Sequence, residues 1–394
     1  MASANPALSG PASLSDPSSS YQDAHMHRPN AVEVDLGAIR SNARIVRKMA
    51  GPDTMLFGAV KCNGYGLGLP AVARAILSGG GDGFTLTDPV DAARIRDGGI
   101  TAPILLYGGV LPSRRMVDWM HELDLMCTVT DASVARAFSE VCSPSRPLRV
   151  FAKIDVGFER LGTYPEDAES FFQLVRTLPG LTVVGMYTHV HGSEHTAYVD
   201  WQLDRFDRLL DKLDSNGIRV PIRMGESSAT LGLQDRPRVN AVDPGHLLYG
   251  ILPAGRTVSP ANLRPALRSL KSRIIQIKEV SRRNFEELAP YPVRDGMRIG
   301  VIPIGRGDGL RGLNAGYVRV RERLVPIVGR LSLEHTRIDV TGLPDCGVGD
   351  EVEIVGGAPG AGLSASEVAA ANQLDAVGLL MEIRSSIPRV YVDS

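Results

Sequence analysis

Short runs of apolar and β-branched residues recur along the first two thirds of the chain, each followed by a segment long enough to form a helix. Eight such runs occur, at residues 56–61, 83–88, 104–108, 126–131, 149–155, 183–189, 222–226 and 241–250. Residues 201–214 show helical spacing, with leucines and a phenylalanine on one face. Eight strand–helix units within about 220 residues favour an α/β fold of the (β/α)8 TIM-type barrel, with a doubly wound sheet as the alternative.

The pattern changes near residue 265, where strands and turns replace the strand–helix alternation. The predicted strands span residues 273–280, 298–305, 317–320, 325–333, 336–340 and 351–355. One helix is expected over residues 366–372, where Ser364 and Glu367 have the spacing of a capping box. The sequence therefore predicts a β-rich C-terminal domain.

Three segments follow from these patterns. Residues 1–29 are rich in Ser, Pro and Ala, and we expect a disordered tail there rather than a signal peptide. Residues 30–264 are predicted to form the barrel, and residues 265–394 the β-rich domain.

Composition narrows the classes of partner. The 394 residues include 43 Lys and Arg against 44 Asp and Glu, a balance that argues against a nucleic-acid-binding protein. No stretch approaches about 18 consecutive apolar residues, so no membrane-spanning helix is expected. The four cysteines are scattered without a CxxC pair, which predicts neither a disulfide framework nor a zinc ribbon and favours a reducing, cytoplasmic setting.

The candidate chemistry lies at the ends of the predicted barrel strands, the face on which barrel enzymes carry their active sites. Lys61 closes the first strand, where desolvation would favour a neutral, nucleophilic amine; a solvated surface lysine is the alternative. Later strands end near charged and polar residues, namely Lys153, Asp155, Arg160, His189, Glu226 and Asp243. The last two strand-end loops are the usual phosphate site in barrels, which makes Ser227, Ser228 and the amides near Gly245 a candidate phosphate cradle.

Two other patterns have simpler explanations. The stretch GRGDGLRG at residues 305–312 is similar to a phosphate loop, but no helix follows it, so a dinucleotide site is not expected. Three histidines, His189, His191 and His195, lie close together in the sequence. We interpret them as solvated loop residues, and no metal site is predicted.

An ordered series of motifs resembles the alanine racemase family over residues 31–394. The motifs are AVEVDLGAIRSNAR (31–44), AVKCNGYGLG (59–68), KIDVGFERLG (153–162), YTHVHG (187–192), IPIGRGDG (302–309) and VPIVGRLSLEHTRIDV (325–340). The resemblance implies a barrel with a C-terminal β domain, the cofactor pyridoxal 5′-phosphate (PLP) and a small amino-acid substrate. It also implies a homodimer whose active site is completed across the interface.

The resemblance assigns roles to individual residues. Lys61 aligns with the lysine that forms the Schiff base with PLP, and His189 with the histidine beside the pyridine ring. Arg160 aligns with an arginine near the PLP phenolate oxygen and the substrate carboxylate, and Lys153 with a lysine that is often carbamylated. The positions that align with phosphate-binding residues are Tyr65, Ser227, Gly245 and the amide of His246.

Several positions depart from the family pattern. Family racemases use a tyrosine from the partner subunit as the second base, whereas the aligned position here is near Glu287, our leading candidate for that base. Other departures are Arg306 for a tyrosine, Leu333 and Glu334 for a Met-Asp pair, and Ser385 for a tyrosine.

Asp243 is the most consequential departure, because it aligns with an arginine that keeps the pyridine nitrogen unprotonated in the family. A carboxylate there would favour the protonated ring, which is a stronger electron sink. The Asp-Pro-Gly sequence is also similar to a motif of barrel-type PLP decarboxylases. The alternative is that Asp243 only caps a turn.

Three functions remain open from the sequence. The prediction is a PLP-dependent amino-acid racemase or epimerase, with Lys61 as one base and Glu287 as the candidate second base. The alternative is a PLP-dependent lyase or transferase that acts by retro-aldol cleavage or decarboxylation, which Asp243 favours. The third is a non-catalytic PLP carrier or degenerate partner subunit, against which the retained Lys61, Tyr65, Arg160 and His189 argue.

Overall fold

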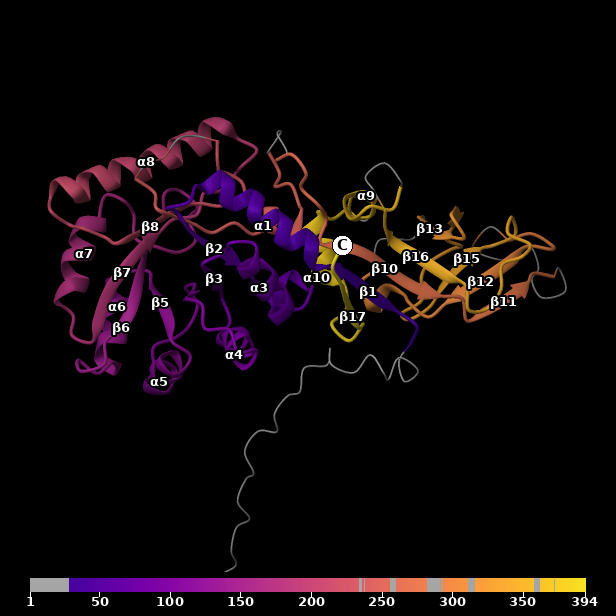
Figure 1. Ribbon diagram of the computed structural model, residues 1–394, viewed down its shortest axis with the longest axis horizontal. Coiled ribbons are helices and arrows are strands. Elements are labelled where there is room, and N and C mark those ends of the chain that lie inside the picture. Colours follow the sequence, from indigo (N-terminus) through magenta and orange to yellow (C-terminus); the bar gives the residue numbers. More distant parts are fainter. Residues whose placement is uncertain are drawn as a thin grey trace, which may run out of the picture.

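A closed barrel and a β domain lie next to each other along the long axis of the molecule (Figure 1). The computed structural model describes residues 28–233, 236, 238–255, 260–281, 291, 293–310, 316–357, 362–371 and 373–394. None of the helices within these ranges is both long enough and apolar enough to cross a membrane.

Eight parallel strands form the barrel. They are β2 (Met55–Ala59), β3 (Gly83–Leu86), β4 (Ile104–Leu106), β5 (Leu125–Val129), β6 (Leu148–Lys153), β7 (Leu181–Tyr187), β8 (Ile222–Glu226) and β9 (Ala241–Val242). Strand β9 pairs with both β8 and β2, which closes the sheet on itself. The predicted (β/α)8 barrel is confirmed, because a doubly wound sheet would leave two open edges.

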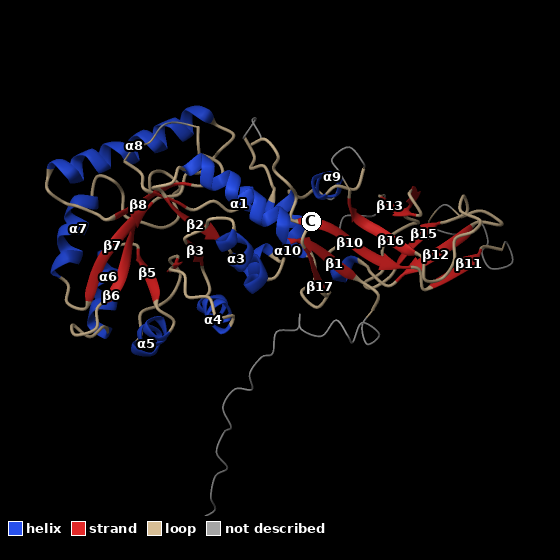
Figure 2. Ribbon diagram, in the orientation of Figure 1, coloured by secondary structure: helices blue, strands red, loops and turns tan. Residues whose placement is uncertain are grey.

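Helices surround the strands, as Figure 2 shows in blue around the red barrel. They include α1 (Leu36–Ala50), α3 (Leu69–Ser78), α4 (Pro89–Asp97), α5 (Arg114–Glu122), α6 (Ala132–Val141), α7 (Ala168–Thr177) and α8 (Thr196–Ser215). The side chains of Asp35, Asp88, Ser113 and Asp131 accept backbone N–H groups at the N-termini of four of these helices. The leucines and the phenylalanine predicted on one face of α8 are all buried.

An apolar layer fills the barrel beneath its catalytic face. It consists of Phe57, Leu105, Met126, Phe151, Tyr187, Met224 and Ala241, one from nearly every strand. Packing is tight here: a Cβ added at Gly185 would lie 2.3 Å from the Phe151 ring. The barrel is therefore a filled core whose polar residues stand above a rigid floor.

The β domain contains a six-stranded sheet in the order β14-β13-β16-β10-β1-β17 and a three-stranded sheet in the order β11-β12-β15. The strands are β1 (Ala31–Asp35), β10 (Leu267–Arg273), β11 (Gln276–Glu279), β12 (Arg298–Ile302), β13 (Tyr317–Val320), β14 (Arg323–Pro326), β15 (Thr336–Asp339), β16 (Glu351–Gly356) and β17 (Arg389–Val392). Two helices, α9 (Ala365–Ala371) and α10 (Ala376–Glu382), complete it.

The first strand of the described chain belongs to this second domain. Strand β1 pairs antiparallel with β10 and parallel with β17, although its residues fall inside the interval 30–264 predicted for the barrel. The chain therefore enters the β domain before it forms the barrel. An alternating pattern reveals a strand, but it does not reveal which distant strand is its partner.

The β domain also differs from the sequence prediction in detail. The capping box is confirmed: the Ser364 amide donates to the Glu367 carboxylate at 2.9 Å, and the Glu367 amide donates to Ser364 Oγ at 3.4 Å. Strand β14 ends at Pro326, so the predicted strand 325–333 is mostly a turn segment. The sequence prediction contained neither α10 nor β17.

Candidate active site

A cavity of about 890 Å³ lies at the carboxyl ends of the barrel strands and reaches the two helices of the β domain. Its lining contains Lys61, Tyr65, Arg160, His189, Ser227, Asp243, Gly245 and His246, all singled out from the sequence. Glu287, the predicted second base, lies outside the described residues. The departures Arg306, Leu333, Glu334 and Ser385 do not line this cavity; all four are exposed on the β domain.

Lys61 opens a left-handed turn at the end of β2. Cys62, Asn63 and Gly64 have φ values of 56°, 56° and 62°, and Tyr65 follows at 53°. Left-handed geometry costs about 1–2 kcal/mol for each residue with a Cβ, and such strain is concentrated at functional sites. The turn leaves Lys61 half-buried at the cavity, unlike a solvated surface lysine, and brings Tyr65 back beneath it.

The β domain holds this strained turn in place. Arg389 Nε donates to the carbonyl oxygen of Gly66 at 2.9 Å. A Cβ at Gly66 would lie 2.7 Å from the carbonyl oxygen of Leu380, and one at Gly68 would lie 1.9 Å from the Tyr391 hydroxyl. The two domains thus meet at the turn that carries Lys61. Nothing local in the sequence indicated these contacts.

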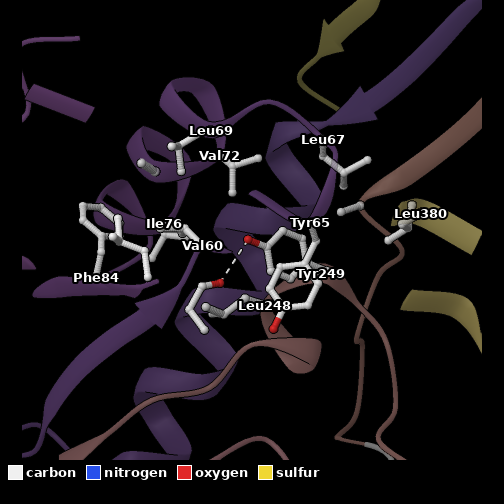
Figure 3. Packing of buried hydrophobic residues seen from close by; sticks show 14 of the residues in the cluster. Val60, Tyr65, Leu67, Leu69, Val72, Ile76, Phe84, Leu248, Tyr249 and Leu380 are labelled. Atoms are coloured by element: carbon white, nitrogen blue, oxygen red, sulfur yellow. Dashed lines mark hydrogen bonds between the residues drawn. The ribbon is translucent and has the colours of Figure 1, made fainter. Parts of the chain in front are cut away.

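Tyr65 is buried against the other wall of the cavity. Its ring lies 4.5 Å from that of Tyr249, with Leu67, Leu248 and Leu380 around the pair (Figure 3). The rings of His246 and Tyr65 lie edge to face, with their centroids 6.2 Å apart.

The predicted phosphate cradle is organised by Ser228. Its Oγ accepts hydrogen bonds from the amides of Gly245 at 2.9 Å and Leu247 at 3.2 Å, at the start of the 3₁₀ turn His246–Tyr249. Ser227 lies on the cavity lining, and its Oγ accepts from the Ala229 amide at 3.4 Å. The amide of Gly245 is therefore bonded to Ser228 in this structure, and its contact with a phosphate stays a prediction.

Asp243 is buried at the mouth of the barrel. Its Oδ2 accepts a hydrogen bond from the Tyr107 hydroxyl, whereas Oδ1 has no hydrogen-bond partner among the described residues. Burial raises the pKa of Asp243 to about 7, although the Tyr107 bond and the charges of Lys61 and Lys153 act to lower it. Neither oxygen caps the adjacent turn, so the turn-capping alternative is wrong.

The charges of Lys61 and Lys153 act on Asp243 within the cavity, and they also affect His189. Lys153 is buried and donates to the Ile154 carbonyl oxygen at 2.6 Å, and burial lowers the pKa of Lys153 to about 8. The pKa of His189 falls to about 3 because of burial and the charges of Lys153, Lys61 and Arg160. His189 is thus neutral near pH 7.

Only two of the three neighbouring histidines are solvated. His191 and His195 are exposed, but His189 is half-buried on the cavity wall, so its interpretation as a solvated residue is wrong. Within the described ranges, no three His, Cys, Asp or Glu side chains are grouped so that they could hold a metal ion.

Arg160 lies at the end of a loop whose backbone amides are bound by one carboxylate, that of Asp155. Asp155 accepts hydrogen bonds from the amides of residues 157–160 at 2.7–3.2 Å. Burial raises the pKa of Asp155, but these four amides bring it below its ordinary value. The guanidinium of Arg160 lies over the Phe158 ring, 4.1 Å from its centroid, and is exposed to the cavity.

The stretch that is similar to a phosphate loop has a structural role. Asp308, in the 3₁₀ turn Arg306–Asp308, is fully buried and pairs with Arg28 at 2.5 Å. Its Oδ2 also accepts the Gly305 amide at 2.9 Å. Glu334 lies beside this pair, 3.3 Å from Arg384.

Two functional candidates were absent from the sequence analysis. Tyr107 donates a hydrogen bond to Asp243, and Arg389 donates one to Gly66 in the turn that carries Lys61. In each pair the two residues are more than 100 positions apart in the sequence. The sequence offered one signal for Tyr107: it directly follows the third barrel strand, and the other candidate residues were identified because they follow strand ends in the same way.

Two family models match the chain: "Alanine racemase, N-terminal domain" over residues 34–253 and "Alanine racemase, C-terminal domain" over residues 267–391. The alanine racemase of Methanococcus maripaludis is 30% identical over 373 residues, which cover 92% of this chain and 99% of that protein. The alanine racemase of Desulfosudis oleivorans is 32% identical over 375 residues, covering 91% of this chain and 95% of that protein.

Solved structures agree with these matches. Alanine racemase from Bacillus anthracis with bound L-Ala-P superimposes with a TM-score of 0.84 at 28% identity, covering 93% of this chain and 96% of that one. Alanine racemase from E. faecalis gives a TM-score of 0.83 at 28% identity, covering 93% and 99%. The models span both folded domains and the relatives match over nearly their whole length, so the chain belongs to the alanine racemase family.

Proposed function

We propose that this protein is a PLP-dependent amino-acid racemase. The observation that carries the proposal is the placement of Lys61, Arg160, His189 and Asp243 around one cavity at the catalytic face of the barrel. The family relatives are named alanine racemases, which favours racemisation over the lyase or transferase alternative.

The described residues fit PLP in three respects. A half-buried amine, Lys61, opens on the cavity. The backbone at Gly245 has no room for a side chain, since a Cβ there would lie 2.5 Å from the Tyr65 hydroxyl, so the Tyr65 hydroxyl and the backbone at Gly245 lie close together on the wall proposed to receive the phosphate. Asp243 Oδ1 is a buried oxygen without a hydrogen-bond partner among the described residues, as expected where a ligand group completes a site.

The chemistry that PLP supplies when bound is an electron sink for negative charge at the substrate Cα. Lys61 would hold the cofactor and move the Cα proton on one face of the substrate. Glu287 remains our candidate for moving the proton on the opposite face. A second subunit would supply that base, in a homodimer.

The remaining residues orient and tune the site. Arg160 would bind the substrate carboxylate, because its guanidinium is open to the cavity. Neutral His189 would pack against the cofactor ring without adding charge. Tyr65, Ser227 and the amide of His246 would bind phosphate, and Asp243 Oδ1 would share a proton with the ring nitrogen.

We also propose a cytoplasmic location and a small amino-acid substrate. The four cysteines, Cys62, Cys127, Cys142 and Cys346, are all free thiols, which is usual in a reducing compartment.

The test is isotope exchange coupled to chirality. The PLP-loaded protein is incubated with single L-amino acids in deuterated water, and Cα deuterium and the D/L ratio are followed. We expect both enantiomers with deuterium at Cα, and loss of this activity in Lys61→Ala but not in the exposed Lys278→Ala control. Release of carbon dioxide or an aldehyde without racemisation would show a lyase instead.

A second comparison addresses the second base. Glu287→Gln is compared with Glu286→Gln, its neighbour in the sequence. If Glu287 moves the proton on one face, the Gln variant loses racemisation while Cα exchange of one enantiomer persists. Equal effects of the two substitutions would assign that base elsewhere.

A further inference from the structure

Tyr107 reaches across the mouth of the barrel to Asp243. It directly follows β4, whereas Asp243 directly follows β9, and β2 and β3 separate these strands in the closed sheet. The Tyr107 hydroxyl donates a hydrogen bond to Asp243 Oδ2. Both side chains line the cavity, so this bond lies inside the site and not beside it.

The Tyr107 ring is itself held from below. It stacks on the Tyr187 ring, with centroids 5.1 Å apart and planes 29° apart. The Tyr187 hydroxyl lies 3.3 Å from Thr128 Oγ1, which donates to the Leu106 carbonyl oxygen at 2.8 Å. Because Tyr187 belongs to the apolar floor of the barrel, the Tyr107 ring rests on rigid packing, with its hydroxyl directed at Asp243.

The hydrogen bond from Tyr107 makes the two oxygens of the Asp243 carboxylate different from each other. Oδ2 is satisfied by Tyr107, while Oδ1 is buried and unpartnered among the described residues. A carboxylate free to rotate would exchange these roles, and one bonded at both oxygens would have nothing left to offer a ligand. Leaving a buried oxygen unpaired is unfavourable, so the arrangement points to a ligand donor at Oδ1.

We propose that Tyr107 is a positioning residue, which holds the Asp243 carboxylate so that Oδ1 is available to the ring nitrogen of the bound cofactor. This inference rests on the proposed function, because it needs PLP in the cavity. Tyr107 would act through Asp243 and would not itself contact the reacting atoms.

Tyr107 is suited to donate and not to exchange protons. Burial, the neighbouring Asp243 charge and the hydrogen bond itself raise the pKa of Tyr107 well above its ordinary value. The hydroxyl therefore keeps its proton throughout the accessible pH range. A donated hydrogen bond stabilises the carboxylate form of Asp243 against the effect of burial.

A double-mutant cycle tests this coupling. Apoproteins of the wild type, Tyr107→Phe, Asp243→Ala and the double variant are titrated with PLP, and the dissociation constant and the absorption band of the bound cofactor are recorded against pH. Tyr187→Phe is the matched control, because it keeps the stacked ring and removes a buried hydroxyl that makes no hydrogen bond to Asp243. Thermal unfolding of each apoprotein verifies the fold, and Asp243→Leu replaces Asp243→Ala if the latter does not fold.

We expect Tyr107→Phe to weaken PLP binding about tenfold and to shift the pH dependence of the cofactor band. In the Asp243→Ala background the same substitution should change the dissociation constant less than about twofold, because its partner is gone. The Tyr187→Phe control should leave the pH dependence of the band unmoved.

Two outcomes overturn the inference and are distinguishable. A wild-type chain that binds no PLP removes the proposed function and this inference with it. A wild type that binds PLP, with equal effects of Tyr107→Phe in the two backgrounds or none in either, leaves the proposed function standing and excludes Tyr107 as a positioning residue for Asp243.

Discussion

Gly245 and Tyr65 approach so closely that a Cβ at Gly245 would lie 2.5 Å from the Tyr65 hydroxyl oxygen. The two residues follow the last and the first strands of the barrel, which are hydrogen-bonded neighbours only because the sheet closes. The wall proposed to receive the cofactor phosphate is thus formed at the seam of the barrel.

Gly245→Ala should therefore damage cofactor binding. The added methyl group would displace the Tyr65 ring, which is buried against Tyr249 and has little room to move. We expect PLP to bind about tenfold more weakly or worse, since overpacking costs about 1–3 kcal/mol. Titration of the apoprotein with PLP measures this. Gly342→Ala is the control, because nothing lies within 4 Å of a Cβ at that position; equal affinities in the two variants would contradict the prediction.

Asp243→Asn should change how the stability of the apoprotein depends on pH. Burial raises the pKa of Asp243 from 3.8 to about 7, so between these values the folded protein holds a proton that the unfolded chain has released. The stability associated with this group is full at low pH and is lost as the pH rises toward 7. Asparagine cannot ionise, so over that range the free energy of unfolding of the variant should rise relative to that of the wild type, by up to a few kcal/mol.

Urea unfolding of both apoproteins at pH 5 and pH 8 measures this gain. The difference in free energy of unfolding should favour Asp243→Asn more strongly at pH 8. A difference that is the same at both pH values would show that Asp243 does not titrate in this range.

Arg389→Ala should loosen the turn that carries Lys61. The guanidinium donates to the carbonyl oxygen of Gly66 in that turn and to those of Ile383, Arg384 and Ile387 in its own domain. We expect a loss of about 2–3 kcal/mol in the free energy of unfolding, together with weaker PLP binding, because the strained backbone loses its anchor.

The control for Arg389 is Arg273→Ala, which removes an exposed guanidinium bonded to the Gly349 carbonyl oxygen at 2.8 Å. It should cost well under about 1 kcal/mol and leave PLP affinity unchanged. Lower stability of Arg389→Ala with unaltered affinity would restrict Arg389 to a role in holding the domains together.

Asp308→Asn should destabilise the β domain. Asp308 is fully buried and pairs with Arg28 at 2.5 Å, so the neutral amide leaves the half-buried guanidinium with only the more distant carboxylate of Glu334, at 3.9 Å. A loss of about 2 kcal/mol is expected from urea unfolding, less than for a completely buried pair. Asp124→Asn, which breaks the exposed pair with Arg149, should cost about 0–1 kcal/mol. Similar losses in the two variants would contradict the structural role assigned to the GRGDG stretch.

The sequence alone determined the barrel and most of the candidate site. Each of the eight apolar runs overlaps a strand of the closed barrel. Lys61, His189 and Asp243 could be placed together because each follows a strand end, and closure of a parallel barrel brings all those ends to one face. This information is local: hydrophobic period, strand length and the residue after the strand are all readable from neighbouring positions.

Contacts between distant segments were decided only by the tertiary structure. Strand β1 lies in the second sheet because β10 and β17 pair with it, and its own five residues do not specify those partners. Tyr107 meets Asp243 because the barrel closes, and Arg389 meets Gly66 because the two domains pack together. Such contacts depend on the register and packing of the whole fold, for which the chain carries no local pattern.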